Sequence, residues 1–513
     1  MPFRHLAAPL ASLLLPLFAI ACMAVFYLSG HELRGTLLHA DALYLPTMFD
    51  DLLRAGGRLS DWYLTPAPYY FPDFPLYLLA WLLGPTGYLQ ILVFAALQCG
   101  LLFYGSHALA REFDRESGST TALPCAAFSL VAMLGLALTN QEPFVLLLSS
   151  AFHFGTFVSG VFFVLAWLRF ERTGARTALW AACALAFITT LSDSLFMLQA
   201  ALPLAIAGAA RAFLEPGYLA GRRKRRALPW ALFGAAILGQ QGYKVFVMNR
   251  TRYSPHMDLQ HLGANLHDLA AIVQPLWHAV PLFALCWLAF LGCALACAAR
   301  LALRREPPFG LPRGLAWLLV FWLISTAGSL AVSLLVYNVP MMTRYFIAAI
   351  CWPVLLAPLV VAQLLRARAA RVLLAAAFAG CALIGAATVR QWQGHPLQRD
   401  YYPEDVACID KALAAMDLHH GIAQYWDAKT TQYFSHQGIT LAHYDDQLAE
   451  SRWVTSKRYF RPAYDFALVG PQRAAPYNIP RERLEALNGK PALEARCGAY
   501  TVLLYGRDKL KLR

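Results

Sequence analysis

The sequence predicts a polytopic α-helical membrane protein with a small α/β domain at its carboxyl end. Of its 513 residues, 58% are hydrophobic and only 14% are charged. Soluble globular chains carry about 25% charged residues, so much of this apolar surface is expected to face lipid. The apolar residues gather in stretches of about 20, the length that crosses a bilayer. After about residue 390 the composition returns to that of a soluble domain.

Eleven apolar stretches are predicted to be membrane spans. They are residues 7–28, 86–111, 120–139, 144–170, 177–192, 195–213, 228–247, 278–300, 315–337, 346–365 and 371–389. The first is too long for the apolar core of a signal peptide, and no clear cleavage site precedes Gly30. We therefore expect it to be retained as a span. The chain divides into a membrane domain, residues 1–394, and an extracytoplasmic domain, residues 395–513.

The basic loops predict the orientation of these spans. With the amino terminus in the cytoplasm, every strongly basic connection falls on the cytoplasmic side, as the positive-inside rule requires. These connections contain Arg111 and Arg115, Arg172 and Arg176, the run 222–226, Arg304 and Arg305, and Arg366, Arg368 and Arg371. The carboxyl terminus is then outside, in the periplasm of a bacterial inner-membrane protein. The net charge of +13 follows from these loops and does not indicate nucleic-acid binding.

Two outer loops are long, residues 30–75 and 248–277. In the first, apolar residues recur at helical spacing between Asp41 and Gly56, which predicts an amphipathic helix lying on the membrane surface. Gly56 and Gly57 end this helix, and an aromatic run up to Pro72 is typical of a membrane interface. The second loop predicts a short helix near residues 258–274.

The last 120 or so residues predict an α/β fold. Pro403 to Met416 reads as a helix. Four segments read as strands: Ile422–Tyr425, Ile439–His443, Phe466–Val469 and Tyr500–Tyr505. Cys408 and Cys497 are the two cysteines of this domain, and an oxidising compartment favours a disulfide between them. The bond would join the first helix to the last strand. The other nine cysteines lie in or beside spans, and no CxxC or HExxH metal pattern is present.

Acidic residues at the outer face are the first candidates for chemistry. Asp41 directly follows the first span, close to lipid, where a carboxylate is costly. It is either a helix N-cap or a general base that takes a proton from an acceptor hydroxyl, and the two roles are compatible. Asp193, between the fifth and sixth spans, is likewise a catalytic candidate or an N-cap. Asp73, in a proline-rich turn, is structural or approaches a cavity. Asp50, Asp51 and Asp61 read as solvated or capping groups.

Four cations depart from the positive-inside pattern and are predicted at the outer face. They are Lys244, Arg250, Arg252 and Arg344. Guanidinium groups match phosphate geometry, so these residues are candidates for binding a lipid phosphate. Snorkelling of long side chains at the interface is the alternative. His153 lies in an apolar run, where it is either a satisfied core residue or part of a cavity.

The segment Asp41-Ala42-Leu43-Tyr44, a short helix, a Gly-Gly stop, aromatic residues and the stretch Phe74 to Gly84 resemble the GT-C membrane glycosyltransferases. The bacterial branch related to protein O-mannosyltransferases and lipid A aminoarabinose transferases is the most similar. That family opens its first outer loop with an Asp-Glu pair, whereas Ala42 stands at the second position here. Arg344-Tyr345-Phe346 resembles the family's Arg-Tyr-Phe-Leu-Pro segment.

The resemblance implies transfer of a sugar from a polyprenyl phosphate to an extracytoplasmic acceptor, usually with inversion. Asp41 would be the base, and Glu142, after the third span, stands where such enzymes often place a second acid. Arg344 would bind the donor phosphate, with Tyr345, Tyr44, Asp73 and His153 as further substrate-binding candidates. The expected partners are the lipid-linked donor, a lipid or glycan acceptor and membrane lipids. No cofactor is expected, and a divalent metal ion is left open.

Two other classes of protein compete with the enzyme. The first is a transporter or flippase of lipid-linked intermediates, but the sequence has neither repeated halves nor broken helices at the membrane midplane. The second is a non-catalytic envelope assembly protein, which the missing acid at Ala42 keeps open.

Overall fold

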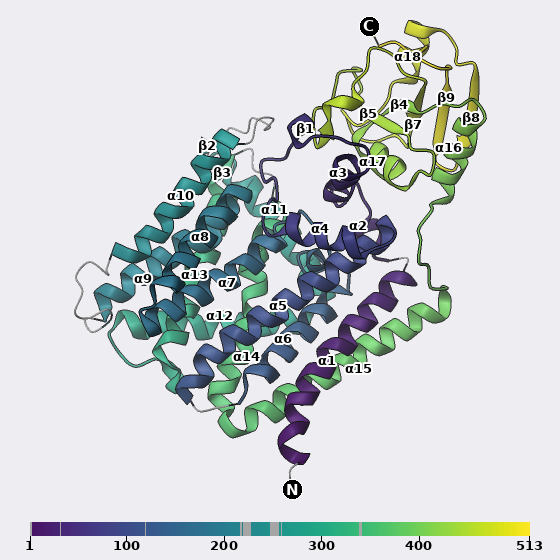
Figure 1. Ribbon diagram of the computed structural model, residues 1–513. Coiled ribbons are helices and arrows are strands. Elements are labelled where there is room, and N and C mark those ends of the chain that lie inside the picture. The colour runs from purple at the N-terminus through teal and green to yellow at the C-terminus, as the bar shows by residue number, and fades with distance from the viewer. Residues whose placement is uncertain are drawn as a thin grey trace.

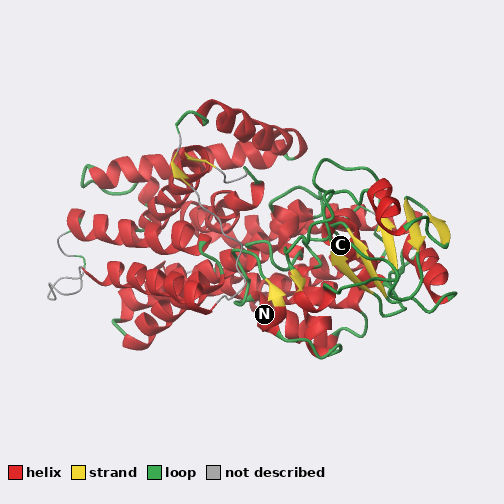
Figure 2. Ribbon diagram, turned by 90° about the horizontal axis from the view of Figure 1, so that it is seen from above, coloured by secondary structure: helices red, strands yellow, loops and turns green. Residues whose placement is uncertain are grey.

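The computed structural model describes residues 3–30, 32–117, 120–215, 218, 227–246, 256–257, 259–337 and 341–512. A body of long helices carries a smaller unit with a five-stranded sheet near the carboxyl terminus (Figure 1). Figure 2 shows the sheet set apart from most of the helices. Among the described residues, seven segments are long and apolar enough to cross a membrane. The expected class, a membrane-embedded helical protein, is thus supported.

Every expected span overlaps a helix over most of its length. The helices are α1 (Phe3–Leu28), α5 (Gly87–Ser117), α6 (Ala122–Ala137), α7 (Phe154–Thr173), α8 (Arg176–Ser192), α9 (Leu202–Leu214), α10 (Leu228–Phe246), α12 (Pro281–Ala302), α13 (Arg313–Leu335), α14 (Ile347–Leu365) and α15 (Ala369–Gly394). The last of the seven apolar segments covers both α14 and α15, which a turn at Arg366–Arg368 separates. By contrast, α6 and α8 are apolar but short.

The helical body exposes apolar side chains, as contact with lipid requires. On α12 the side chains of Leu282, Leu285 and Leu295 all lie at the surface. Large apolar patches facing water are unfavourable in a soluble protein, so this face is suited to a bilayer. α1 and α15, from opposite ends of the helical body, lie side by side (Figure 1), and Gln391 donates to the carbonyl of Phe26 at 2.8 Å.

The expected span 144–170 is wrong in its first part. A 3₁₀ turn, η2 (Phe144–Leu148), is followed by a loop in which Ala151 and His153 have positive φ, and α7 begins only at Phe154. Positive φ is unusual for residues other than glycine and cannot continue a helix. The chain therefore turns sharply before α7, which brings the 149–153 loop into the interior.

The first outer loop is more structured and more buried than expected. It forms α2 (Arg34–Leu37), α3 (Tyr44–Leu53), η1 (Leu59–Asp61) and β1 (Trp62–Tyr63), and the helix α4 (Asp73–Leu83) follows. Leu45 and Met48 of α3 are fully buried. They pack with Tyr77 of α4 and with Val454 of the carboxyl-terminal unit. Protein rather than lipid covers the apolar face of α3, so the expectation of a helix lying on the membrane surface is wrong.

The second outer loop contains α11 (Leu262–Ala279), later than the expected helix at 258–274. Before it, β2 (His256–Met257) pairs with β3 (Val336–Tyr337). After α13, η6 (Thr343–Phe346) leads into α14. A π-helical turn, η3 (Met197–Ala201), leads into α9.

The carboxyl-terminal unit is an α/β fold, and its four expected strands are present with bounds shifted by at most two residues. Its helices are α16 (Glu404–Ala414), α17 (Tyr425–Phe434) and α18 (Arg481–Asn488). Its sheet has the order β5 (Thr440–His443), β4 (His420–Ala423), β7 (Phe466–Val469), β9 (Tyr500–Leu504) and β8 (Leu493–Cys497). β4 is parallel to β5 and β7, and the pairs β7–β9 and β9–β8 are antiparallel.

The disulfide and a short strand pair tie this unit together and attach it to the helical body. Cys408 of α16 is bonded to Cys497, which ends the unexpected strand β8 rather than the last strand. β1 of the first outer loop pairs with β6 (Thr455–Ser456), with Trp62 opposite Ser456. The carboxyl-terminal unit is therefore attached to the loop that carries Asp41.

Candidate functional site

A cavity of about 350 Å³ lies where the first outer loop, the 149–153 loop, η6 and the carboxyl-terminal unit meet. Its lining residues are Asp41, Tyr44, Thr65, Pro66, Ala67, Tyr69, Ala151, Phe152, His153, Met342, Arg344, Tyr345, Tyr425, Trp453 and Val454. Pockets of this size bind small molecules and usually combine an apolar lining with a few polar groups. Five of the candidates expected from the sequence line this cavity: Asp41, Tyr44, His153, Arg344 and Tyr345.

Asp41 has two polar partners in the cavity. The hydroxyl of Tyr425, the first residue of α17, donates to Oδ1 at 2.5 Å. Nη1 of Arg344 lies 3.9 Å from Oδ2. The N-cap role is wrong, because α3 begins at Tyr44 and no side chain caps it.

Arg344 presents an incompletely satisfied cation to the cavity. Its guanidinium lies over the rings of Phe152 and Tyr345, with its central carbon 5.6 Å and 5.8 Å from the two centroids. Its Nε is buried and has no hydrogen-bond partner among the described residues. Buried donors are normally paired, so an unpaired one beside a cavity is suited to an anionic ligand.

Asp193, His153 and Tyr69 form a hydrogen-bonded chain on one side of the cavity. Nδ1 of His153 lies 2.6 Å from Oδ2 of Asp193, and Nε2 lies 3.2 Å from the hydroxyl of Tyr69. A carboxylate only accepts hydrogen bonds, so Nδ1 carries the proton that faces it. In the neutral imidazole, Nε2 then accepts from Tyr69. Asp193 thus orients His153 and, through it, the tyrosine hydroxyl.

The pKa values of the two buried carboxyl groups near His153 shift in opposite directions. Burial alone would raise the pKa of Asp193, but the His153 imidazole and the hydrogen bonds from His153 and Thr156 lower it overall. Leu195 N–H also donates to Asp193, so its capping alternative holds beside the contact with His153. Burial raises the pKa of Asp73 to about 7, although its Oδ1 accepts a hydrogen bond from the Ala151 amide at 3.0 Å. Asp73 holds the 149–153 loop through this hydrogen bond and lines neither of the cavities described here.

A second cavity of about 270 Å³ adjoins the first. Both are lined by Pro66, Ala67, His153 and Tyr345. The second extends between the start of the sixth expected span and α13, and Leu195, Leu198 and Val332 give it apolar walls. Asp193 lines this second cavity, whereas Asp41 lines only the first.

The remaining expected site residues lie elsewhere. Glu142 is exposed at the surface and lines neither cavity. The charge of Arg344 partly offsets the rise in the pKa of Glu142 that desolvation causes. Lys244 is exposed in the last turn of α10. Arg250 and Arg252 lie outside the described residues. The interpretation of Asp51 as a solvated group is wrong, because it is buried and accepts a hydrogen bond from the Trp62 indole at 2.7 Å.

Three residues of the site were not predicted from the sequence: Tyr69, Tyr425 and Lys429. Tyr69 belonged to an aromatic run that is typical of a membrane interface. Tyr425 and Lys429 are four residues apart on α17, so they share one face of a helix, but Tyr425 was expected to end a strand. The i, i+4 spacing indicates only that the two side chains share a helix face. Their place in the site follows from the contact of that face with α3.

Lys429 is buried directly behind Asp41 and Tyr44. Its Nζ lies 3.2 Å from Oγ1 of Thr47 and over the rings of Tyr44 and Trp62, 5.7 Å and 5.5 Å from their centroids. Burial lowers the pKa of Lys429 to about 7, against the opposing effect of the Asp41 charge.

Among the described residues, no group of three or more histidine, cysteine, aspartate or glutamate side chains is placed to hold a metal ion. Comparison of the chain with family models, with curated proteins and with solved structures found no match.

Proposed function

We propose that the protein is an integral membrane glycosyltransferase that moves a sugar from a polyprenyl-phosphate donor to an envelope acceptor, a lipid or a glycan. The observation that carries this proposal is the meeting of Asp41 and Arg344 in one cavity. A carboxylate base and a partly unsatisfied guanidinium are the two groups that transfer from a phosphate leaving group requires.

The proposed step uses both groups at once. Asp41 removes the proton of the acceptor hydroxyl as its oxygen forms a bond to the anomeric carbon. The bond between that carbon and the phosphate oxygen breaks, and its electron pair leaves with the polyprenyl phosphate. Arg344 stabilises the negative charge of the departing phosphate. Attack on the face opposite the phosphate gives inversion at the anomeric carbon.

Tyr425 and the chain Asp193–His153–Tyr69 are positioning groups in this proposal. Tyr425 holds the carboxylate of Asp41 from the carboxyl-terminal unit. Tyr69 and Tyr345 present polar groups and ring faces to the place where the sugar would lie. The adjoining cavity, with its apolar walls between Leu198 and Val332, would accept the first part of the isoprenoid tail.

The proposal also includes the number of membrane spans and their orientation. We place eleven spans in a bacterial inner membrane, with the cavity at the periplasmic face and residues 395–513 in the periplasm. The basic loops support this orientation. The Cys408–Cys497 disulfide supports an oxidising compartment.

The test is a transfer assay with the full-length protein in nanodiscs and a panel of radiolabelled polyprenyl-phosphate sugars. Envelope glycans of a deletion strain, compared by mass spectrometry, identify the acceptor to use. Asp41→Asn should lower kcat by roughly 10²–10⁴-fold, the usual contribution of a general base. Arg344→Ala should lower it by roughly 10²–10³-fold, as loss of a charge-stabilising donor does.

Matched controls are Asp268→Asn and Arg452→Ala, both at exposed positions outside the cavities. Both should transfer sugar at the wild-type rate. Full transfer by Asp41→Asn would show that Asp41 is not the base. Binding of the donor without transfer by the wild-type protein, for every donor and the identified acceptor, would support the transporter or the assembly protein instead.

A further inference from the structure

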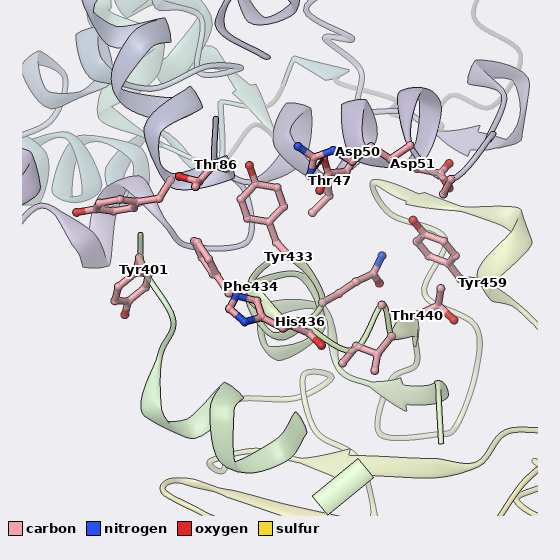
Figure 3. Close-up of a pocket in the computed structure, with 18 of the residues that line it drawn as sticks. Thr47, Asp50, Asp51, Thr86, Tyr401, Tyr433, Phe434, His436, Thr440 and Tyr459 are labelled. Carbon is pink, nitrogen blue, oxygen red and sulfur yellow. Dashed lines mark ion pairs between the residues drawn. The ribbon is translucent and has the colours of Figure 1, made fainter. Parts of the chain in front are cut away.

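A second site lies outside the Asp41 cavity and is larger than it. It is a groove of about 580 Å³ between the helical body and the carboxyl-terminal unit (Figure 3). One wall comes from α3 and the turn before α5, with Thr47, Asp50 and Thr86. The other comes from the end of α17, from β5 and from η8 (Lys457–Tyr459). The proposed transfer chemistry uses none of its lining residues.

Charges in the groove balance. Three carboxylates and three guanidinium groups line it: Asp50, Asp51, Asp400, Arg54, Arg458 and Arg461. Two pairs are formed within the groove, Arg54 with Asp50 at 3.1 Å and Arg458 with Asp51 at 3.6 Å. A site for phosphate or nucleic acid would carry excess positive charge. The groove is instead suited to a neutral ligand that has many hydrogen-bonding groups.

Aromatic side chains and small polar groups line the same groove. Tyr401 and Tyr433 are half-buried and line the groove, and the Arg34 guanidinium lies over the Tyr401 ring at 4.7 Å. In Figure 3 the side chain of Tyr433 extends from the carboxyl-terminal unit toward Thr47 of α3, with His436 and Thr440 on the opposite side of the opening. Rings that stack on C–H faces, beside groups that hydrogen-bond to hydroxyls, are the combination that recognises sugars.

The groove and the Asp41 cavity share two walls. α3 places Tyr44 in the cavity and Thr47, one turn later, in the groove. α17 likewise places Tyr425 in the cavity and Tyr433, two turns later, in the groove. Lys429 lies between them and contacts Thr47. A chain bound in the groove would therefore approach the cavity along these two helices.

We propose that the groove binds a neutral oligosaccharide segment, and that this segment belongs to the acceptor. Binding of a saccharide is inferred from the groove alone. The role of that saccharide as the acceptor rests on the proposed transferase function. The acceptor would accordingly be a glycan without charged sugars where it contacts the protein.

The test measures binding of defined probes to the full-length protein in nanodiscs by ligand-observed NMR and calorimetry. The neutral probes are maltotetraose, cellotetraose, chitotetraose and mannotetraose, and the anionic ones are inorganic phosphate and a hyaluronan tetrasaccharide. At least one neutral probe should bind. Tyr433→Ala should weaken its binding by about tenfold, the loss expected for one stacking ring. Tyr433→Phe keeps the ring and should bind within about twofold of wild type.

His436→Ala serves as a second variant because His436 is exposed; its ring stacks on Tyr402, so the unfolding temperature of this variant is recorded beside binding. It should weaken binding by about threefold. The inference is overturned if no neutral probe binds at millimolar concentration, if only the anionic probes bind, or if Tyr433→Ala and His436→Ala both bind like wild type.

Failure of this inference and failure of the proposed function are distinguishable. Asp41→Asn should lower transfer by roughly 10²–10⁴-fold and leave binding of the neutral probe unchanged. Binding that depends on Tyr433 in a protein whose transfer is insensitive to Asp41→Asn would retain the saccharide site and reject Asp41 as the base.

Discussion

At the scale of the residue, buried charged groups identify the site more clearly than their positions in the sequence do. Asp41 was conspicuous as a carboxylate near lipid, but its partners Tyr425 and Arg344 come from distant segments. Lys429 is more unusual, because a lysine is rarely buried without a full counter-charge. Its protonation should therefore affect the stability of the folded protein.

Lys429 predicts a pH dependence of stability. Its pKa is about 7 in the folded protein, below its ordinary value of 10.5, because burial disfavours the charged form. Between these two pH values the unfolded chain binds more protons, so stability should rise with pH by up to ~5 kcal/mol. Lys429→Met should be more stable than wild type at pH 7 and should lose this rise. The apparent unfolding temperature in detergent, recorded from pH 7 to 10.5, measures the effect.

The control for this prediction is Lys411→Met, which removes an exposed lysine of α16. It should follow the wild-type curve. The difference between wild type and Lys429→Met isolates Lys429 from the tyrosines that titrate in the same range. Parallel curves for wild type and Lys429→Met would show that the lysine is not desolvated in solution.

At the scale of the element, the break before α7 is the feature that builds the site. If the helix had been continuous from residue 144, His153 would have been one residue within a membrane span. Instead the 149–153 loop turns inward, and its Ala151 amide is held by the carboxyl group of Asp73 at the start of α4. The contact is close, because Gly155 of α7 leaves room for that carboxyl group.

Gly155→Ala should therefore damage the site. A Cβ at this position would overlap with Oδ2 of Asp73, so the carboxyl group must move and release the Ala151 amide. Loss of a buried hydrogen bond costs about 1–3 kcal/mol, and we expect a lower unfolding temperature and weaker transfer. Thermal unfolding and the transfer assay measure the two effects.

Gly160→Ala is the matched control on the same helix. Its nearest neighbour would be Cβ of Ala200 at 4.0 Å, an ordinary contact. Alanine favours helices over glycine by about 0.8–1.0 kcal/mol, so this variant should be as stable as wild type or slightly more stable. Equal behaviour of the two variants would contradict the close approach of Asp73 to α7.

At the scale of the whole molecule, the carboxyl-terminal unit is part of the candidate site and more than an appendage. Its residues Tyr425, Trp453 and Val454 line the Asp41 cavity, and β6 pairs with β1 of the first outer loop. The compartment of this unit therefore decides on which side of the membrane the cavity opens.

The disulfide tests that compartment. In cells, the free thiols are blocked under denaturing conditions, and the protein is then reduced and treated with a maleimide reagent of high mass. Because only Cys408 and Cys497 are bonded and the other nine cysteines are free, we expect two added labels. Cys408→Ser with Cys497→Ser should add none. A wild-type protein that also adds none has reduced thiols, which would place the unit in the cytoplasm.

Much of the fold follows from local patterns in the sequence. Apolar stretches of membrane length all overlap helices over most of their length, and alternation and turn residues located the four strands of the carboxyl-terminal sheet. The errors were at places where contacts between distant segments override local pattern: the break at 149–153, the burial of α3, and the strand β8.

The sequence by itself determined that the chain is a helical membrane protein, and it indicated Asp41, Arg344 and His153 as polar groups near apolar ones. Those predictions rest on the high cost of polar groups in lipid, which is a local property. Only the tertiary structure decided that Asp41 meets Arg344 and Tyr425, that Asp193 orients His153, and that Glu142 and Lys244 lie apart. Packing between residues hundreds of positions apart sets these contacts, and no spacing along the chain encodes it.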